Sequence, residues 1–407
     1  MKTYLDKNVY EAALERIAYC FQEFDNVLVA FSGGKDSGVM LNLCYDYANE
    51  HGLLDKLTMY HLDYEAQYQM TTEYVTRTFL EQFPGIRKMW YCVPIKAQSA
   101  CALGEPYWTP WDAAKKKLWV RAMPENPYVV HEGNLDVPFR HGMVDYEFQD
   151  KLSRHFAKKR GTTAVMVGLR ADESLNRYAA VARGKKRRSY EGRKWITQTS
   201  AVTANVYPLY DWRVSDIWTA TARFGFDYNR LYDLLYQAGL TAGQMRVASP
   251  FNDCAQESLK LYKVIDPSNW ARMIGRVNGV NFTGLYGGTT AMGWKTIKLP
   301  PGHTWKSYYE FLLSTMDART AAHYNNILEK SKRYWMQGGT VDPGTADEVL
   351  AAYPLAAVTG KSGRYDGRDI VQFMGYPDDM PVSNFRQVPS YKLSLIHISE
   401  PTRLALI

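Results

Sequence analysis

The stretch from Asn26 to Leu41, NVLVAFSGGKDSGVML, holds the residues of this chain best suited to chemistry. Glycines in a loop let backbone N–H groups point inward, and a following helix adds positive potential at its start, so a strand, a loop and a helix in this order bind anions. Lys35 adds a full positive charge, and the hydroxyls of Ser32 and Ser37 can donate to phosphate oxygens. The stretch therefore predicts a phosphate-binding loop.

Asp36 narrows the chemistry of this loop. A carboxylate repels a bare phosphate, so we expect Asp36 either to contact a bound Mg²⁺ or to orient the loop. The spacing is neither the GxxxxGK[ST] of the Walker loop nor the GxGxxG of dinucleotide-binding domains. The alternative is a serine-glycine turn whose charges have no role, which the apolar segments on both sides make the weaker interpretation.

The composition is that of an ordinary globular protein. The chain has 407 residues, of which 46% are hydrophobic and 22% charged, enough for a large core or two domains. No apolar run approaches the roughly 20 residues of a membrane span, and charges interrupt the first twenty residues, where a signal peptide would be apolar. We therefore expect a soluble, cytoplasmic protein. The net charge of +7 suits a ligand that carries phosphate.

The cysteines exclude several kinds of site. Their number is odd, they are scattered, and none forms a CxxC pair, which argues against a disulfide framework, a zinc site and a four-cysteine iron–sulfur cluster. Cys20 and Cys44 fall on apolar helix faces, where we expect small core residues. The five are Cys20, Cys44, Cys92, Cys101 and Cys254.

The elements that must position the loop alternate between strands and helices. This alternation predicts an α/β protein with a doubly wound, mostly parallel sheet. The expected helices are Val9–Phe24, Ser37–Asn49, Met70–Phe83, Lys151–Arg160 and Val214–Phe224. The expected strands are Val27–Phe31, Lys56–Asp63, Arg87–Val93, Thr163–Leu169 and Ala204–Leu209.

The pattern also suggests how the chain divides. We expect a nucleotide-binding domain over residues 1–240, in which residues 99–150 form an irregular insertion over the sheet that is rich in Trp and Pro. The alternation fades after residue 240, which predicts a mostly helical C-terminal domain over residues 241–392. Its expected helices are Ser258–Ile265, Asn269–Val277, Ser307–Met316 and Ala318–Gln337.

The end of the sequence has an unusual composition. The segment Leu393–Arg403, LSLIHISEPTR, resembles the translation of an adapter used in sequencing libraries. We therefore expect residues 393–407 to be non-native read-through and the native C-terminus to be missing. The alternative is a genuine terminal strand.

Three segments together resemble one known family. SGGKDS is identified as the signature of the PP-loop superfamily, which contains ATP pyrophosphatases and sulfonucleotide reductases. GLRADESLNR, Gly168–Arg177, resembles a segment of the phosphoadenylyl-sulfate (PAPS) reductases, and YPLYDWRVSDIW, Tyr207–Trp218, resembles another. The match covers roughly residues 20–240 and includes Tyr228–Gly239. It implies an adenine nucleotide α-hydrolase-like fold.

The resemblance assigns roles to individual residues. Arg170 and Arg177 would face the phosphates or sulfate of the nucleotide, beside Gly168, because guanidinium groups bind oxyanions in pairs of hydrogen bonds. Asp172 and Glu173 would orient the arginines or hold a metal, unless they form ordinary surface salt bridges. The nucleotide and phosphate contacts are completed by Ser32, Gly33, Gly34, Lys35, Asp36 and Ser37.

Three further features lie outside the loop. Asp63 ends a predicted strand where this fold contacts ribose, and its carboxylate can accept from ribose hydroxyls, whereas we expect His61 to be a core residue. Asp211 and Trp212 are expected to cap the following helix and to pack the core, with Asp211 at most supporting the site. The basic run Arg183–Lys194 predicts either a solvated loop or a lid that contacts phosphate or nucleic acid.

The whole chain most resembles a bacterial and phage branch of the PAPS reductase-like family, the YbdN/IbrA-like proteins, to which DYEAQY at Asp63–Tyr68 corresponds. The resemblance implies links to ParB-like nuclease partners and to gene regulation. It departs from true PAPS reductases, which attack the substrate sulfur with a C-terminal cysteine, because no cysteine follows Cys254.

This departure leaves three hypotheses. The favoured one is an ATP pyrophosphatase that transfers AMP to an unknown acceptor, with Lys35, Asp36 and Arg170 as catalytic residues, Mg²⁺ as cofactor and no iron–sulfur cluster. The second is a sulfonucleotide reductase or a sulfotransferase-like enzyme acting on PAPS. The third is a non-catalytic nucleotide-sensing regulator that acts with DNA or a ParB-like nuclease.

Overall fold

The computed structural model describes residues 6–102, 105–182, 189–247, 249–252, 255, 258–287, 299–342, 344–363 and 367–399. The chain forms two compact units. The larger consists of Met1–Gln98 and Tyr107–Asn281, and the smaller of Ser99–Pro106 and Phe282–Ile407. The predicted boundary near residue 240 stays a prediction. No helix in the described ranges has the length and apolar character that crossing a bilayer requires.

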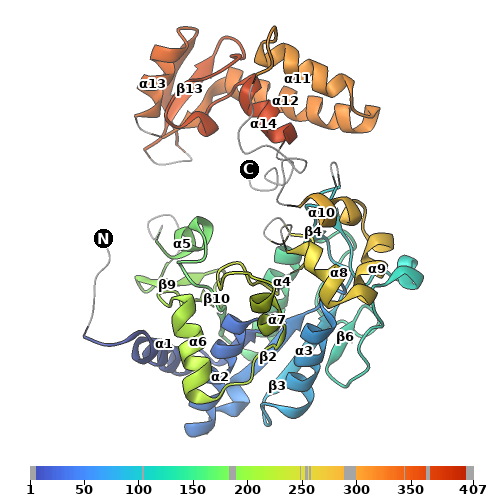
Figure 1. Cartoon of the computed structure of the whole chain (residues 1–407). Coiled ribbons are helices and arrows are strands. Elements are labelled where there is room, and N and C mark those ends of the chain that lie inside the picture. The colour runs from blue at the N-terminus through green and yellow to red at the C-terminus, as the bar shows by residue number, and fades with distance from the viewer. Residues whose placement is uncertain are drawn as a thin grey trace. The chain divides into compact units, whose positions relative to one another are not determined.

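The larger unit is built on one sheet with helices around it (Figure 1). Within the described residues this sheet has eight strands, in the order β6-β3-β2-β1-β7-β10-β9-β8. The first six strands in this order are parallel, and the last two are antiparallel additions at one edge. The strands are β1 (Asn26–Ala30), β2 (Leu57–Leu62), β3 (Arg87–Cys92), β6 (Val129–His131), β7 (Thr163–Met166), β8 (Ser189–Tyr190), β9 (Arg193–Gln198) and β10 (Thr203–Val206). A separate hairpin pairs β4 (Ala97–Gln98) with β5 (Tyr107–Trp108).

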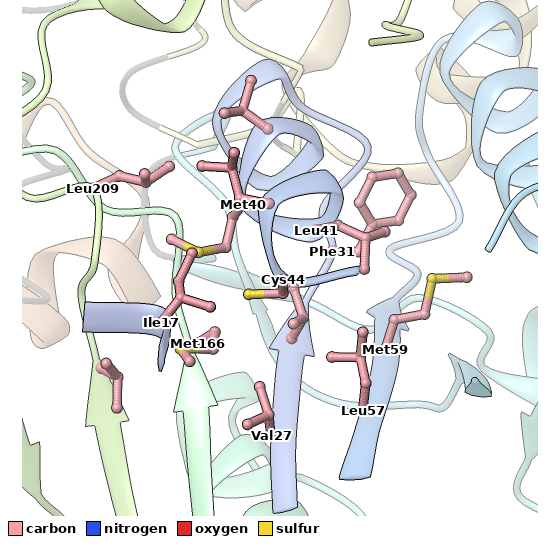
Figure 2. Packing of buried hydrophobic residues seen from close by; sticks show 14 of the residues in the cluster. Ile17, Val27, Phe31, Met40, Leu41, Cys44, Leu57, Met59, Met166 and Leu209 are labelled. Carbon is pink, nitrogen blue, oxygen red and sulfur yellow. The ribbon is translucent and has the colours of Figure 1, made fainter. Parts of the chain in front are cut away.

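Helices cover both faces of this sheet. Val27 and Val29 of β1 face α1, α2, α3 and α6, whereas Leu28 faces α4. Figure 2 shows Ile17 and Cys44 packed beside Val27 and Met166 on the first of these faces. The helices are α1 (Val9–Glu23), α2 (Lys35–Glu50), α3 (Gln69–Glu81), α4 (Asp145–Arg160), α5 (Leu175–Ala182), α6 (Val214–Phe224), α7 (Leu231–Gln237), α8 (Tyr262–Ile265) and α9 (Pro267–Arg276).

The predicted fold class is confirmed. Each strand expected in the first 240 residues corresponds to one of the parallel strands, and each expected helix to one of the helices. One boundary matters for the site, because α2 begins at Lys35, two residues earlier than expected. The edge strand β6 lies inside the stretch expected to be irregular, since its three residues are too few to show a pattern.

The smaller unit combines helices with a small sheet. The expected helical character is confirmed by α11 (Trp305–Ser314), α12 (Ala318–Gly338), α13 (Thr345–Ala352) and α14 (Tyr391–Ser399), while α10 (Val280–Tyr286) includes the point at which the units divide. The sheet was not predicted. It pairs β11 (Gly339–Val341) and β12 (Ala356–Lys361) with the central β13 (Asp369–Phe373), all antiparallel. Residues 393–399 fall within α14, and their non-native origin stays a prediction.

We predict that Phe148→Ala destabilises the larger unit by about 3–5 kcal/mol, because the ring is fully buried between Tyr91 and Phe139 and its loss leaves a cavity. Tyr146→Ala on the same helix is the matched control. Its ring is 71% exposed, so we expect a change within about 0.5 kcal/mol. Urea unfolding followed by circular dichroism measures both, and equal effects would contradict the assignment of α4 to the second layer.

Candidate functional site

The candidate site lies where the strand order reverses. On one side of β1 the sheet continues with β2, β3 and β6, and on the other side it continues with β7 and β10. The direction in which strands are added therefore changes at β1. Ligands of open α/β sheets bind at such a point, outside the carboxyl ends of the strands. The loops after β1 and β7 meet there, and they carry SGGKDS and GLRADES, respectively.

The loop after β1 is held in shape by its own serines. Ser37 Oγ donates to the carbonyl of Gly34 at 3.0 Å and accepts from the backbone N–H of Ser32 at 3.1 Å. Gly33 has φ +76°, a left-handed conformation that favours glycine. Gly34 is the N-cap of α2 and provides no capping side chain. Apart from the N–H of Lys35, which donates to Tyr232, the first turn of α2 therefore keeps backbone N–H groups for an anion.

Two buried cations meet at this loop. Lys35 is 8% exposed and Arg170, from the loop after β7, is 3% exposed. Asp36 joins them: one carboxylate oxygen lies 3.2 Å from Lys35 Nζ, and the other accepts from Arg170 Nε. Arg170 also pairs with Asp172 at 2.5 Å. Burial alone would lower the pKa of Arg170, but Asp36 and Asp172 raise it above its ordinary value, so the guanidinium is charged.

Gly168 makes this meeting sterically feasible. A Cβ at Gly168 would lie 3.0 Å from the carbonyl carbon of Asp36 and 3.0 Å from the backbone nitrogen of Ser37. Side-chain atoms essentially do not approach backbone that closely, so a larger residue would push the two loops apart. The sequence placed Gly168 among the binding residues, and the structure shows it in contact with the loop backbone.

Arg177 forms an ion pair with Glu173 and not with Asp36. It pairs with Glu173 at 2.5 Å, and Glu173 also lies 3.4 Å from Arg246. Two arginines therefore share one carboxylate beside the Arg170 loop. Arg246 was missed in the sequence, because no motif or periodicity distinguishes it in a segment without regular structure.

Two further residues that support the loop were also missed. Tyr232 of α7 is fully buried, its hydroxyl accepts from the backbone N–H of Lys35 at 3.1 Å, and its ring lies 5.2 Å from Lys35 Nζ. Asn229 donates to the carbonyl of Gly33 at 3.3 Å and to Thr71. Both belong to the segment Tyr228–Gly239. The sequence of this segment resembles the family, but the resemblance did not indicate that the segment contacts the loop after β1.

Asp63 is more enclosed than a ribose contact requires. Its side chain is fully buried, and its oxygens accept from Arg121 at 2.5 Å, Trp90 Nε1 at 2.7 Å and the backbone N–H of Glu65 at 2.8 Å. Burial alone would raise the pKa of Asp63, but Arg121, His61 and the hydrogen bond from the backbone N–H of Glu65 lower it below its ordinary value. The contacts favour a structural role, and the ribose contact stays a prediction. His61 is buried in the core, as expected.

The next acidic residue in the motif fixes the insertion to the sheet. Glu65 is fully buried and adopts φ +66°. Its carboxylate accepts from Arg276 of α9 at 2.8 and 2.9 Å, and from the backbone N–H groups of Trp111 at 2.7 Å and Val120 at 2.9 Å. The DYEAQY segment therefore serves to anchor the chain that follows β5.

The sequence analysis expected Asp211 to cap α6, and this expectation is wrong. Its carboxylate pairs with both terminal nitrogens of Arg16 on α1, at 2.6 and 2.8 Å, while the N–H of Arg213 is capped by Asp216. Trp212 is 1% exposed and packs in the core, as expected. Asp211 therefore attaches α1 to the chain after β10.

The carboxylates near the loop do not fit a resident metal site. Both oxygens of Asp36 are paired with cations, Asp172 is paired with Arg170, and Glu173 with two arginines. Within the described residues, no three His, Cys, Asp or Glu side chains are grouped as metal ligands. Of the two roles expected for Asp36, the contacts favour orienting the loop.

The sequence matches two family models that together span most of the chain. Residues 26–238 match the phosphoadenosine phosphosulfate reductase domain, and residues 239–400 match a domain of unknown function, DUF3440. An uncharacterized protein, YbdN, of Escherichia coli strain K12 is 34% identical over 353 residues, 86% of this chain and 85% of its own length. The chain belongs to the PAPS reductase family.

Solved structures with a similar fold include two enzymes of yeasts. The match to the PAPS reductase of Candida auris, in complex with phosphate, covers 57% of this chain and 93% of the reductase chain, with 15% sequence identity and a TM-score of 0.32. The match to the FMN adenylyltransferase of Candida glabrata covers 56% of this chain and 62% of the transferase chain, with 13% sequence identity and a TM-score of 0.31.

We predict that Gly168→Ala weakens binding of an adenine nucleotide about 5- to 150-fold, because the added Cβ costs about 1–3 kcal/mol of overpacking against the loop backbone. Gly275→Ala is the matched control, since a Cβ there meets no atom within 4 Å. Isothermal titration with ATP compares the two variants. An unchanged affinity in Gly168→Ala would show that the close approach of the two loops does not shape the site.

We predict that Asp63→Asn lowers stability by about 3–5 kcal/mol at pH 7, because it removes the charge that pairs with Arg121. Since the pKa of Asp63 in the folded protein lies below its ordinary value of 3.8, its contribution is present above that pH and is lost as pH falls through the folded pKa. Thermal unfolding of both proteins between pH 7 and 2.5 tests this. A difference that does not shrink with acid would contradict the assignment.

Proposed function

We propose that this protein binds ATP at the loop after β1 and cleaves it between the α- and β-phosphates, transferring AMP to an acceptor. The supporting observation is the convergence of two buried cations, Lys35 and Arg170, on one loop at the reversal of the sheet. A buried cation interacts strongly with an oxyanion because little water screens the pair. The nearby Arg177 and Arg246 add positive charge.

The proposed step is a displacement at phosphorus. An acceptor oxygen forms a bond to the α-phosphorus, and the bond from that phosphorus to the oxygen bridging the β-phosphorus breaks. Pyrophosphate leaves with the electron pair, and the proton of the acceptor passes to solvent. Lys35 and the N–H groups at the start of α2 stabilise the charge that develops on pyrophosphate, while Arg170 holds the α-phosphate.

Asp36 is a positioning residue in this proposal. In the nucleotide-free protein it neutralises Lys35 and Arg170, which would otherwise be two buried like charges. The phosphates of ATP replace Asp36 as partners of both cations. ATP arrives as its magnesium complex, in which the metal binds phosphate oxygens, and no step depends on a resident metal.

The four cysteines that the structure describes favour this reaction over reduction of a sulfonucleotide. Cys20, Cys44, Cys92 and Cys101 are all buried, and burial raises the pKa of each thiol, for Cys101 to about 11. The nucleophile in sulfur chemistry is the thiolate, which such groups do not supply at neutral pH. Cys254 and residues 183–188 of the basic run lie outside the described residues.

We predict that the full chain, given ATP and a cell extract as the source of acceptors, releases pyrophosphate, and that Lys35→Ala reduces this release about 10²–10³-fold. Lys260→Ala, which removes an exposed lysine outside the site, is the control. Pyrophosphate is measured by an enzyme-coupled assay, and the adenylated product is identified by mass spectrometry.

Three outcomes contradict the proposal. Sulfite release from PAPS with a thiol reductant, without cleavage of ATP, would assign the protein to sulfonucleotide reduction. Binding of ATP without turnover would indicate a nucleotide-sensing regulator, for which DNA and a ParB-like nuclease are the partners to test. Equal activity of Lys35→Ala and the unmodified chain would place the reaction elsewhere.

A further inference from the structure

A second cavity lies beside the edge strand β6, among residues that the loop site does not use. Its volume is about 880 Å³, within the roughly 300–1,000 Å³ of typical ligand pockets. Val129 and His131 of β6 line it, together with the chain between β5 and β6 and Arg272 of α9. The 3₁₀ helix η2 (Ala113–Leu118) packs against α9, so the walls of the cavity belong to one folded region of the larger unit.

The walls of this cavity are strongly basic. Lys116, Lys117, Arg121 and Arg272 line it, against the single carboxylate of Glu125. Arg121 is paired with Asp63. In the part of the chain that the structure describes, Lys116, Lys117 and Arg272 form no ion pair with a carboxylate within 4 Å. Three cations without counter-charges around one cavity attract oxyanions.

The same cavity has a fixed aromatic wall. Trp119 lines it, and its Nε1 donates to the carbonyl of Asp112 at 2.9 Å. The ring packs edge-on against Trp111, with centroids 5.1 Å apart, and Lys116 Nζ lies 5.8 Å from its centre. Met123 and two prolines extend the apolar surface. A positioned indole costs little entropy on binding and stacks with any nucleobase.

We propose that this cavity is a second nucleotide-binding site, in which Lys116, Lys117 and Arg272 hold phosphate and Trp119 supports the base. The ligand is a nucleoside phosphate, either free or as one unit of a single-stranded nucleic acid. A plain anion site would not need the aromatic wall, and an apolar site would not carry three unpaired cations. The site is separate from the loop after β1, and it does not depend on the reaction proposed there.

The test uses the full chain and a fluorescein-labelled single-stranded thymidine 12-mer, with affinity measured by fluorescence anisotropy at several salt concentrations. The triple variant K116Q/K117Q/R272Q should bind at least 10-fold more weakly. It should also lower the slope of log affinity against log salt by about 2, because each phosphate contact on a single strand contributes about 0.7. The three side chains are exposed and unpaired, so circular dichroism should show an unchanged fold.

Matched variants separate this site from general charge and from the loop. K260Q/R223Q removes two exposed cations outside the cavity and should keep full affinity. Trp119→Leu should weaken binding about 10-fold through lost stacking, with the salt slope unchanged. Lys35→Ala should bind the 12-mer with unchanged affinity, because Lys35 does not line the cavity. The binding test of the second site therefore stays valid even if the proposed transfer of AMP is disproved.

The two sources of the ligand are distinguished by competition with thymidine monophosphate. Displacement of the 12-mer by the mononucleotide would identify a free nucleotide as sufficient, and its failure to compete would identify the strand; each result supports the site. The proposal is overturned if the triple variant and K260Q/R223Q bind equally. It is also overturned if the unmodified chain binds neither probe at 50 mM salt, or if Lys35→Ala abolishes binding of the 12-mer.

Discussion

The carboxylate of Asp36 is the contact on which the candidate site depends, because it holds two buried cations from different loops at one point. Lys35 comes from the first turn of α2, and Arg170 from the loop after β7. Without Asp36 their charges would repel in a region with little water. The close approach also requires a glycine at position 168, since any larger side chain would meet the backbone of the first loop.

The rest of the larger unit keeps these loops in register. The apolar face of α2 packs on β1, β2 and β7, which fixes where the helix begins and therefore where Lys35 lies (Figure 2). Tyr232 and Asn229 bind the backbone of the loop from the opposite side. Buried or half-buried ion pairs then attach more distant chain segments to the sheet, Glu65 with Arg276 for the insertion and Arg16 with Asp211 for α1. A buried pair adds little net stability but strongly penalises any arrangement that separates its partners.

Much of the fold and part of the site could be predicted from the sequence. Fully apolar runs such as Val27–Phe31 identify buried parallel strands, and SGGKDS lies where such a strand meets a helix. Arg170 was found through its motif. Arg246, Asn229 and Tyr232 were not assigned, because their roles arise from contacts between segments far apart in the chain. The separation is about 200 residues for Asn229 and Tyr232 and about 70 residues for Arg246. The helix cap expected of Asp211 was wrong for the same reason, since its partner Arg16 lies 195 residues away. The small sheet of the C-terminal unit was missed because its strands have only three, six and five residues, and β12 is exposed over all but its first residue, so no apolar run marks them.

Membership of the PAPS reductase family establishes an adenine nucleotide-binding fold. The proposal of chemistry at phosphorus rests on the two convergent cations and on the burial of the four cysteines that the structure describes. The most direct test is a crystal structure of the full chain with a non-hydrolysable ATP analogue. The expected result is that the phosphates contact Lys35 and Arg170 and that both cations have left Asp36. A nucleotide bound with its phosphates elsewhere, with Asp36 still paired to both cations, would contradict the central claim.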